Sequence, residues 1–218
     1  MRVLAIIPAR KSSKRLKNKN FKNFNGKPLI YWTIQKALRS KYIDQVLVST
    51  DSEVILKYCK KFSKVVVSRR PNRLAKDNSL IEDVLKYELT KKKFKKFDYF
   101  ILLQPTSPLR TLKTIEKSLK ISIQNNINSC VSFLKKKINL VNLYQFKNKK
   151  IINTKFNYDK SKFKYFSPSG DIYICKIKYF LKTKKIIFKD TYPIFVNRNI
   201  SDIDDEKDFK LAEIKHKN

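Results

Sequence analysis

The chain has 218 residues, 42% of them hydrophobic, and 51 lysines and arginines against 18 aspartates and glutamates give it a formal net charge of +33. This length and apolar content suit one domain with a single core and argue against a disordered chain. No run approaches eighteen apolar residues, so no transmembrane helix is expected, and the first residues already form a strand pattern, so no signal peptide is expected.

Strand and helix patterns alternate in the amino-terminal third. Residues 2–7 form a continuous apolar run with β-branched members, which is typical of a strand buried on both faces. Apolar residues at helical spacing after Pro28 predict a helix. The elements predicted here are strands at 2–7, 45–49 and 64–68 and helices at 29–40 and 52–61. Their order predicts an α/β fold with a doubly wound parallel sheet.

The same alternation continues to residue 134. Ser79, with Glu82 three residues later, predicts a capping box at the start of a helix that runs to about residue 92. Thr111 is predicted to cap a helix that runs to about residue 124. Strands are predicted at 98–103 and 129–134.

From residue 135 to residue 167 the pattern changes, because glycine is absent and polar and aromatic residues alternate around one strand pattern at 140–146. We interpret this stretch as an excursion within a single domain that covers residues 1–218. The chain is then predicted to return with a strand at 170–175, a helix at 176–183, a strand at 192–196 and a final amphipathic helix after residue 204.

A basic loop at residues 8–20 follows the first strand. The loop follows the carboxyl end of this strand, so it places positive charge at the edge where open α/β sheets bind ligands. A basic loop at that edge suits a polyphosphate. The alternative is a solvated basic connection. The loop contains no glycine, so it is neither a Walker A loop nor a dinucleotide fingerprint. Its basic residues are Arg10, Lys11, Lys14, Arg15, Lys17 and Lys19.

A second candidate site lies in residues 104–110, QPTSPLR, after the strand at 98–103. Two prolines fix the path of the loop, Gln104 offers amide groups, and Arg110 offers a guanidinium. The alternative is a proline-stiffened turn without a ligand.

A third candidate site is the pair Asp202 and Asp204. Alternate residues of an extended segment face the same side, so the two carboxylates can converge on one hard cation. The alternative is that Asp204 only caps the last helix while Asp202 is solvated.

Three separated motifs resemble the acylneuraminate (sialic acid) cytidylyltransferase family. They are PAR-x-x-SKR-x-x-x-KN at 8–20, LLQPTSPLR at 102–110, and R-x-x-SDID at 198–204. This chain departs from the family pattern with Lys11-Ser12 in place of two glycines, Leu80 in place of a serine, and Ser169 in place of an asparagine. The resemblance implies a Rossmann-like, mostly parallel sheet of the nucleotide-diphospho-sugar transferase type.

The resemblance also implies an activity: the transfer of CMP from CTP to the anomeric hydroxyl of a nonulosonic acid, with release of pyrophosphate, in surface polysaccharide biosynthesis. It implies that Asp202 and Asp204 hold Mg²⁺ and act in catalysis with Arg10 and Lys19. The residues implied to bind the nucleotide are Ala9, Arg10, Ser13, Lys14, Arg15, Lys19, Asn20, Arg70 and Asp77. Those implied to bind the sugar acid are Gln104, Thr106, Ser107, Gly170 and Tyr173.

The excursion at 135–167 carries apolar residues that need a surface to bury against, and exposed patches of this kind usually mark a partner surface. The family that it resembles dimerises through an excursion at this place, so we expect a two-fold homodimer. The alternative is a small hairpin that folds back on its own domain.

Two other functions stay open from the sequence. One is a sugar nucleotidyltransferase with a different base or sugar. The other is a polyanion-binding protein, although 42 of the basic residues are dispersed lysines and only nine are arginines, so no specific nucleic-acid or membrane partner is expected. The three widely spaced cysteines are expected to be reduced core thiols in a cytoplasmic protein.

Overall fold

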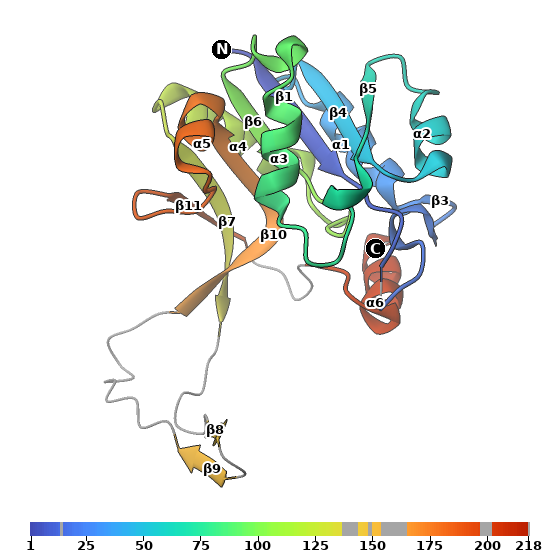
Figure 1. The fold of residues 1–218 in the computed structure, drawn as a ribbon, viewed down its shortest axis with the longest axis vertical. Helices are drawn as coiled ribbons and strands as arrows, with labels where there is room; N and C mark the ends of the chain where they lie inside the picture. The colour runs from blue at the N-terminus through green and yellow to red at the C-terminus, as the bar shows by residue number, and fades with distance from the viewer. Residues whose placement is uncertain (14, 137–143, 148–149, 154–164, 197–201, 218) are drawn as a thin grey trace.

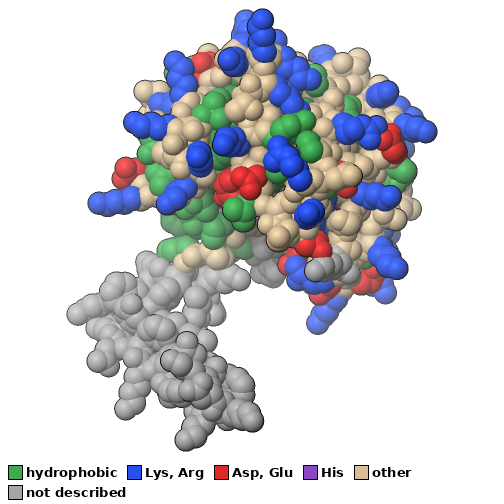
Figure 2. Space-filling view, in the orientation of Figure 1, with side chains coloured by type: hydrophobic (Ala, Val, Ile, Leu, Met, Phe, Trp, Pro, Cys, Tyr) green, Lys and Arg blue, Asp and Glu red, His purple; other side chains and the backbone are tan. Residues whose placement is uncertain are grey.

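The structure is a computed structural model that describes residues 1–13, 15–136, 144–147, 150–153, 165–196 and 202–217 (Figure 1). Lysine and arginine side chains are scattered over the face shown in Figure 2, with acidic side chains between them, and do not gather in one patch there. Among the described residues no helix is long and apolar enough to cross a membrane.

The main sheet has seven strands in the order β11-β7-β10-β6-β1-β4-β5. Only β10 runs against its neighbours, so the prediction of a doubly wound, mostly parallel sheet is confirmed with one reversed strand. In the central pairs Ile6 lies opposite Leu47 of β4 and Leu102 of β6. The strands are β1 Val3–Pro8, β4 Gln45–Thr50, β5 Val65–Arg69, β6 Tyr99–Leu102, β7 Ser129–Lys136, β10 Tyr165–Lys176 and β11 Tyr192–Phe195.

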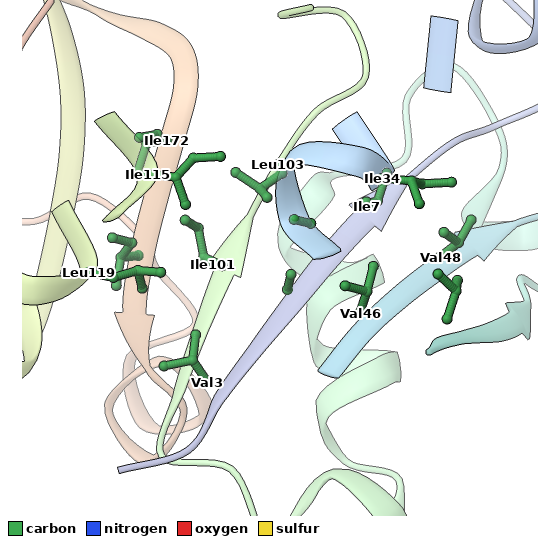
Figure 3. Close-up of a cluster of buried hydrophobic side chains, with 14 of the residues drawn as sticks. Val3, Ile7, Ile34, Val46, Val48, Ile101, Leu103, Ile115, Leu119 and Ile172 are labelled. Atoms are coloured by element: carbon green, nitrogen blue, oxygen red, sulfur yellow. The ribbon is translucent and has the colours of Figure 1, made fainter. Parts of the chain in front are cut away.

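Helices cover both faces of the sheet because successive strand residues point to opposite sides. Val3, Ala5 and Ile7 of β1 belong to a core with α1 Leu29–Arg39, α2 Glu53–Cys59 and α4 Leu112–Gln124 (Figure 3). Leu4 and Ile6 belong to the opposite core with α3 Ile81–Leu89 and α5 Ile177–Thr183. Leu4, Ile6 and Ile7 are fully buried, so truncating one of them to alanine is expected to cost about 2–5 kcal/mol of stability.

Local capping signals were only partly predictive. Thr111 caps α4 as predicted, since its Oγ1 accepts from the Thr114 N–H at 3.1 Å. The predicted Ser79–Glu82 capping box is wrong, because α3 begins at Ile81 after Leu80, which offers no side-chain cap. The Ser79 hydroxyl instead donates to the Arg73 carbonyl at 3.1 Å and closes the preceding loop, which contains a 3₁₀ turn at Asn72–Leu74.

The carboxyl-terminal helix, α6 Glu206–Lys217, docks beside the basic loop. A short hairpin of β2 Asn23–Phe24 and β3 Lys27–Pro28 receives it, and sequence analysis missed this hairpin. Its turn is Asn25-Gly26, with positive φ at both residues, as two-residue hairpin turns require. The Asn25 side chain donates to the Glu213 carbonyl at 3.0 Å, and Phe24 packs edge-on against Phe209. This docking fixes residues 202–204 next to residues 15–19.

The predicted excursion begins where β7 and β10 project from the body of the molecule (Figure 1). A separate two-stranded sheet, β8 Tyr144–Lys147 with β9 Lys150–Asn153, follows beyond them. Of the strand predicted at 140–146, residues 144–146 lie in β8, and residues 140–143 lie outside the described part of the chain. The remaining short elements are 3₁₀ turns at Lys19–Phe21 and Lys92–Phe94, the second of which follows an α3 that ends three residues earlier than predicted.

Candidate active site

A cleft of about 280 Å³ opens at the carboxyl edge of the parallel strands. Residues that follow β1, β5 and β6 line it, together with the start of α3 and the segment before α6. Nine residues that the sequence nominated meet here: Arg10, Ser13, Lys19, Asn20, Arg70, Asp77, Gln104, Thr106 and Asp202. The nominated residues that do not line the cleft are Ala9, Arg15, Ser107, Gly170, Tyr173 and Asp204, and Lys14 lies outside the described residues.

The basic loop is held from several sides, although it lacks the family's two glycines. The Ala9 N–H donates to the Ser49 carbonyl at 2.9 Å, and the Lys11 N–H donates to Asp51 Oδ1 at 2.7 Å. The Asn20 side-chain amide, which is buried, donates to the Arg10 carbonyl at 3.0 Å. These contacts fix the backbone, so the cationic side chains project from a constrained frame.

Lys19 is the most enclosed described cation of this loop. Its Nζ donates to the Ile203 carbonyl at 2.6 Å and lies 3.9 Å from Asp204 Oδ1. Burial lowers the pKa of the Lys19 ammonium, and the nearby carboxylates of Asp202 and Asp204 oppose that shift. Lys19 thus joins the basic loop directly to the acidic segment.

Asp202 and Asp204 occupy different surroundings. The Asp202 carboxylate is largely enclosed, and burial raises its pKa against the opposing effects of a hydrogen bond from Thr106 and the charge of Lys19. Its Oδ1 is buried with no hydrogen-bond partner among the described residues. Asp204 is half-exposed and accepts from the Arg15 guanidinium at 2.8 Å.

The alternative role for Asp204 as a helix cap does not hold. Asp205 Oδ1 accepts from the Asp208 N–H at 2.9 Å, and Asp208 Oδ2 accepts from the Asp205 N–H at 3.3 Å. These reciprocal bonds make Asp205 the capping residue of α6. The Asp204 side chain is therefore left to face Arg15 and Lys19.

The donor set fits a hard cation. Mg²⁺ is commonly held by one or two carboxylates plus phosphate oxygens and water, not by a closed protein cage. Among the described residues no group of three or more His, Cys, Asp or Glu side chains could form such a cage. Asp204, and Asp202, whose buried Oδ1 has no hydrogen-bond partner among the described residues, could supply two carboxylates.

The QPTSPLR loop forms the wall beside Asp202. The Ile203 N–H donates to the Thr106 carbonyl at 2.9 Å, which ties this loop to the acidic segment. The sequence offered the Arg110 guanidinium as a ligand group, and this is wrong, since Arg110 is fully buried. Its Nε donates to the Asp171 carbonyl at 2.5 Å and its Nη2 to the Gln104 carbonyl at 2.7 Å, so it braces the loop from behind.

Gly170 and Tyr173 of β10 enclose Asp202 from the other side. Gly170 has φ +80°, and a Cβ added there would lie 3.4 Å from Ser107 Oγ and 3.7 Å from Asp202 Cβ and Cγ. Burial and the Asp202 charge raise the pKa of the Tyr173 phenol, against the effect of a hydrogen bond with the Gly170 backbone. The strand pairing of β10 with β7 is irregular between Pro168 and Tyr173, which gives the glycine room to approach.

The far end of the cleft holds Arg70 and Asp77. Arg70 is 5% exposed, and its Nη2 donates to the Ser49 carbonyl at 2.8 Å. Burial lowers the pKa of its guanidinium, while Asp51 and Glu88 oppose that shift. Asp77 forms a 2.7 Å ion pair with Arg10, so the basic loop also contacts the segment before α3.

Sequence reasoning missed the apolar wall at this end. It is formed by Leu74, Ile81 and Val84. Ile81 and Val84 are three residues apart on α3, which places them on one face of the helix. Leu80, where the family has a serine, is 63% exposed and does not line the cleft. The other lining residues that were missed are Pro8, Ser12, Lys76, Ser79 and Pro105.

The chain is similar to known proteins along nearly its whole length. Residues 4–217 match the family model described as cytidylyltransferase. The chain is 30% identical over 217 residues to an N-acylneuraminate cytidylyltransferase of Escherichia coli, covering 97% of this chain and 51% of that protein. The chain thus spans about half the length of that relative.

Two relatives are matched along nearly their full length. The flagellin modification protein B of Campylobacter coli is 31% identical over 226 residues, covering 99% of this chain and 96% of that protein. A pseudaminic acid cytidylyltransferase of Campylobacter jejuni is 29% identical over 229 residues, covering 100% and 97% of the two chains.

Solved structures share the fold at lower sequence identity. A CMP:2-keto-3-deoxy-manno-octonic acid synthetase complexed with CTP superposes with a TM-score of 0.73 at 16% identity, covering 100% of this chain and 99% of that chain. A 4-diphosphocytidyl-2C-methyl-D-erythritol synthase of Anaerococcus prevotii gives a TM-score of 0.66 at 11% identity, covering 100% and 96%.

Proposed function

The chain belongs to the cytidylyltransferase family, and from that premise we propose that it transfers CMP from CTP to the anomeric hydroxyl of a nonulosonic acid and releases pyrophosphate. Relatives named for N-acylneuraminate and for pseudaminic acid, both of this sugar class, support the acceptor. The donor is supported by the family description and by the structural neighbour that was complexed with CTP.

One observation carries the proposal: a single cleft joins fixed cations to an enclosed carboxylate. Arg10, Lys19 and Arg70 line the cleft, and the Lys19 ammonium contacts the backbone between Asp202 and Asp204. Anionic phosphates suit the cations, and a divalent ion suits the carboxylates. A ligand that presents both phosphates and a bound cation satisfies all of these groups at once.

We propose that Asp202 and Asp204 hold Mg²⁺ in the working enzyme. The buried Asp202 Oδ1 without a partner supports this, because a bound cation would supply what the described residues do not. The ion would neutralise phosphate charge and polarise the α-phosphate toward attack. Arg15, which now pairs with Asp204, would then turn to a phosphate oxygen.

The protein's own residues have positioning and charge-stabilising roles in this scheme. The sugar hydroxyl loses its proton to solvent as its oxygen attacks the α-phosphorus, the bond between the α-phosphorus and the bridging oxygen breaks, and pyrophosphate leaves. Lys19 and Arg10 stabilise the negative charge that grows on the leaving group. Arg10 would exchange its partner Asp77 for a phosphate oxygen when the nucleotide enters.

We assign the two substrates to different ends of the cleft. Leu74, Ile81 and Val84 offer an apolar surface for the flat base, beside Arg70 and Ser79. Gln104 and Thr106 flank Asp202 and would orient the sugar acid, with Ser107, Gly170 and Tyr173 behind them. Ala9, Ser13 and Asn20 shape the loop that covers the phosphates.

We also propose that the enzyme is a homodimer assembled through residues 135–167 and the adjoining strand ends. Phe166 and Phe195 support this interface, since both rings are exposed and their centroids lie 4.7 Å apart where β7 and β10 leave the body. β11 is an edge strand of the main sheet, and exposed apolar side chains at such an edge usually have a partner.

Free cysteines support a reducing compartment, which we propose to be the cytoplasm. Cys59, Cys130 and Cys175 are free and buried, and burial raises their pKa values to about 12, 11 and 12. Thiols of this kind are inert core groups.

A direct assay tests the proposed reaction. The purified chain with CTP and Mg²⁺ should release pyrophosphate with at least one of N-acetylneuraminate, a legionaminate and a pseudaminate, and should form a product with the mass of the CMP-sugar. Omission of the sugar acid should leave CTP intact. Release without the sugar would indicate plain CTP hydrolysis and would contradict the proposal.

A further inference from the structure

A carboxylate without an assigned role is buried behind the cleft. Glu88 of α3 is 0% exposed. Its Oε1 accepts from the Ser49 hydroxyl at 2.7 Å, and its Oε2 accepts from Lys91 Nζ at 2.6 Å. The same Nζ donates to Ser68 Oγ at 2.6 Å. A charged side chain this deeply buried costs stability unless its partners compensate, so its presence needs a reason.

The carboxylate is connected to Arg70 through Ser49. The Ser49 hydroxyl uses its one hydrogen on Glu88, so its lone pairs face the Arg70 Nε–H at 3.4 Å. The Ser49 carbonyl accepts from Arg70 Nη2 at 2.8 Å. Two of the three guanidinium nitrogens are therefore held on the side of Ser49, and Arg70 Nη1 makes no hydrogen bond to any residue that the structure describes.

We propose that Glu88 is a positioning residue that holds the Arg70 guanidinium, through Ser49, in the orientation that presents its free edge to the nucleotide. The proposal rests on the proposed function, because it assigns the contact to bound CTP. Arg70 lines the cleft, whereas Glu88 does not, so any effect of Glu88 on CTP must pass through its neighbours. In this arrangement α3 contributes to nucleotide binding with a residue that never touches the ligand.

Charge and orientation predict opposite effects on CTP affinity. Removing a carboxylate near the cleft makes the cleft more positive, and charge alone would then tighten the binding of a polyphosphate. Loss of the hydrogen bond that directs the Ser49 hydroxyl would release Arg70 and weaken binding. If an uncharged replacement of Glu88 lowers the affinity for CTP, the loss therefore comes from the changed orientation of Arg70 and not from the change in charge.

The test measures CTP binding by calorimetry in Mg²⁺ without sugar acid, using wild type, Glu88→Gln, Arg70→Gln and the double variant. We expect Glu88→Gln to raise the Kd for CTP on the order of tenfold, which is the size expected for a lost charge-assisted contact. In the Arg70→Gln background the same change should have no further effect, because the residue through which it acts is already gone. Glu116→Gln, on α4 and not among the residues that line the cleft, is the control for removal of a carboxylate and should leave Kd unchanged.

Ser49→Ala covers the case in which Glu88→Gln fails to fold. It removes the hydroxyl that links Glu88 to Arg70 and leaves the carboxylate in place. It should raise Kd in the wild-type background only. Equal, additive losses in both backgrounds would mean that Glu88 or Ser49 merely holds α3 against the sheet, and would overturn the proposal.

The outcomes also separate this proposal from the proposed function. Normal CTP binding by Glu88→Gln and Ser49→Ala, with wild-type catalysis, would overturn the positioning role and leave the reaction intact. Failure of the wild type to bind CTP would overturn the proposed function, and the role of Glu88 with it.

Discussion

The Lys19 ammonium donates to the main-chain oxygen of Ile203, 184 positions later in the chain, at 2.6 Å. This bond joins the loop that supplies cations to the segment that supplies carboxylates. Ile203 itself is fully buried against Phe209 and Leu29, so the contact is anchored in a core. The groups that we propose to bind phosphate and those that we propose to bind the metal therefore share one site.

Asp202→Asn and Asp204→Asn should each abolish turnover while the protein stays folded. Each change removes one of the two carboxylates that we propose to hold Mg²⁺. Pyrophosphate release at limiting Mg²⁺ and circular dichroism together measure the effect. Asp205→Asn, a change at the capping residue of α6, is the control and should retain turnover. Full activity in both Asp202→Asn and Asp204→Asn would contradict the assignment of these residues as metal ligands.

The raised pKa of Asp202 predicts a pH-dependent stability in the absence of divalent metal. A carboxyl whose folded pKa lies above its unfolded value binds protons more tightly in the native state. The free energy of unfolding of the wild type should therefore fall, relative to Asp202→Asn, as pH rises from the ordinary aspartate range through the raised pKa. Urea unfolding in EDTA at a series of pH values measures this difference. A constant difference at every pH would contradict the burial of this carboxylate.

Arg10→Ala and Lys19→Ala should each slow turnover on the order of 10²-fold, because each removes a fixed donor from developing charge. Steady-state kinetics with saturating substrates measures the loss. Lys17→Ala is the matched control, since Lys17 belongs to the same loop and is exposed. Similar kinetics in all three variants would mean that the loop is only a solvated basic connection.

Gly170→Ala and Gly26→Ala should separate backbone strain beside the active site from backbone strain far from it. Both glycines have φ near +80°, so alanine costs about 1–2 kcal/mol at either position. Only Gly170 faces other atoms, with Ser107 Oγ at 3.4 Å and Asp202 at 3.7 Å from the added carbon, whereas Gly26 has none within 4 Å. Thermal unfolding should shift similarly in both variants, while turnover should fall in Gly170→Ala alone. Equal turnover would show that Gly170 is only a strand bend.

Phe195→Glu should convert the proposed dimer into a monomer, because it places a charge within the exposed aromatic pair of Phe166 and Phe195. Light scattering in moderate salt measures the mass, since salt screens the repulsion between lysine-rich chains. Ile214→Glu is a close control, as Ile214 is 60% exposed and Phe195 is 61% exposed. If the wild type is a monomer with full activity, the dimer proposal is wrong and the active site is complete within one chain.

The sequence predicted the parallel core well because buried strands and amphipathic helices carry their period locally, as in Val3–Pro8 and Leu29–Arg39. It predicted the basic loop and the QPTSPLR loop as candidate sites because each follows the carboxyl end of a buried strand, whereas the nomination of Arg70 and Asp77 rested on the family resemblance. The Asn25-Gly26 dipeptide is typical of a two-residue hairpin turn, so the hairpin of β2 and β3 was predictable from the sequence. The role of Arg110 could not be read from its loop, since its burial depends on β10 running antiparallel beside β6. The contact between Lys19 and Ile203 likewise depends on the docking of α6 against Phe24.

The most direct test of the central proposal is pyrophosphate release across a matrix of nucleotides and sugar acids. CTP, GTP, UTP and ATP would each be combined with N-acetylneuraminate, a legionaminate, a pseudaminate and 3-deoxy-octulosonate, in Mg²⁺ and with EDTA controls. We expect release from CTP with at least one nonulosonic acid, little or none with the other nucleotides or with 3-deoxy-octulosonate, and none in EDTA. Release from another nucleotide in preference to CTP, or no release with any nonulosonic acid, would contradict the proposal.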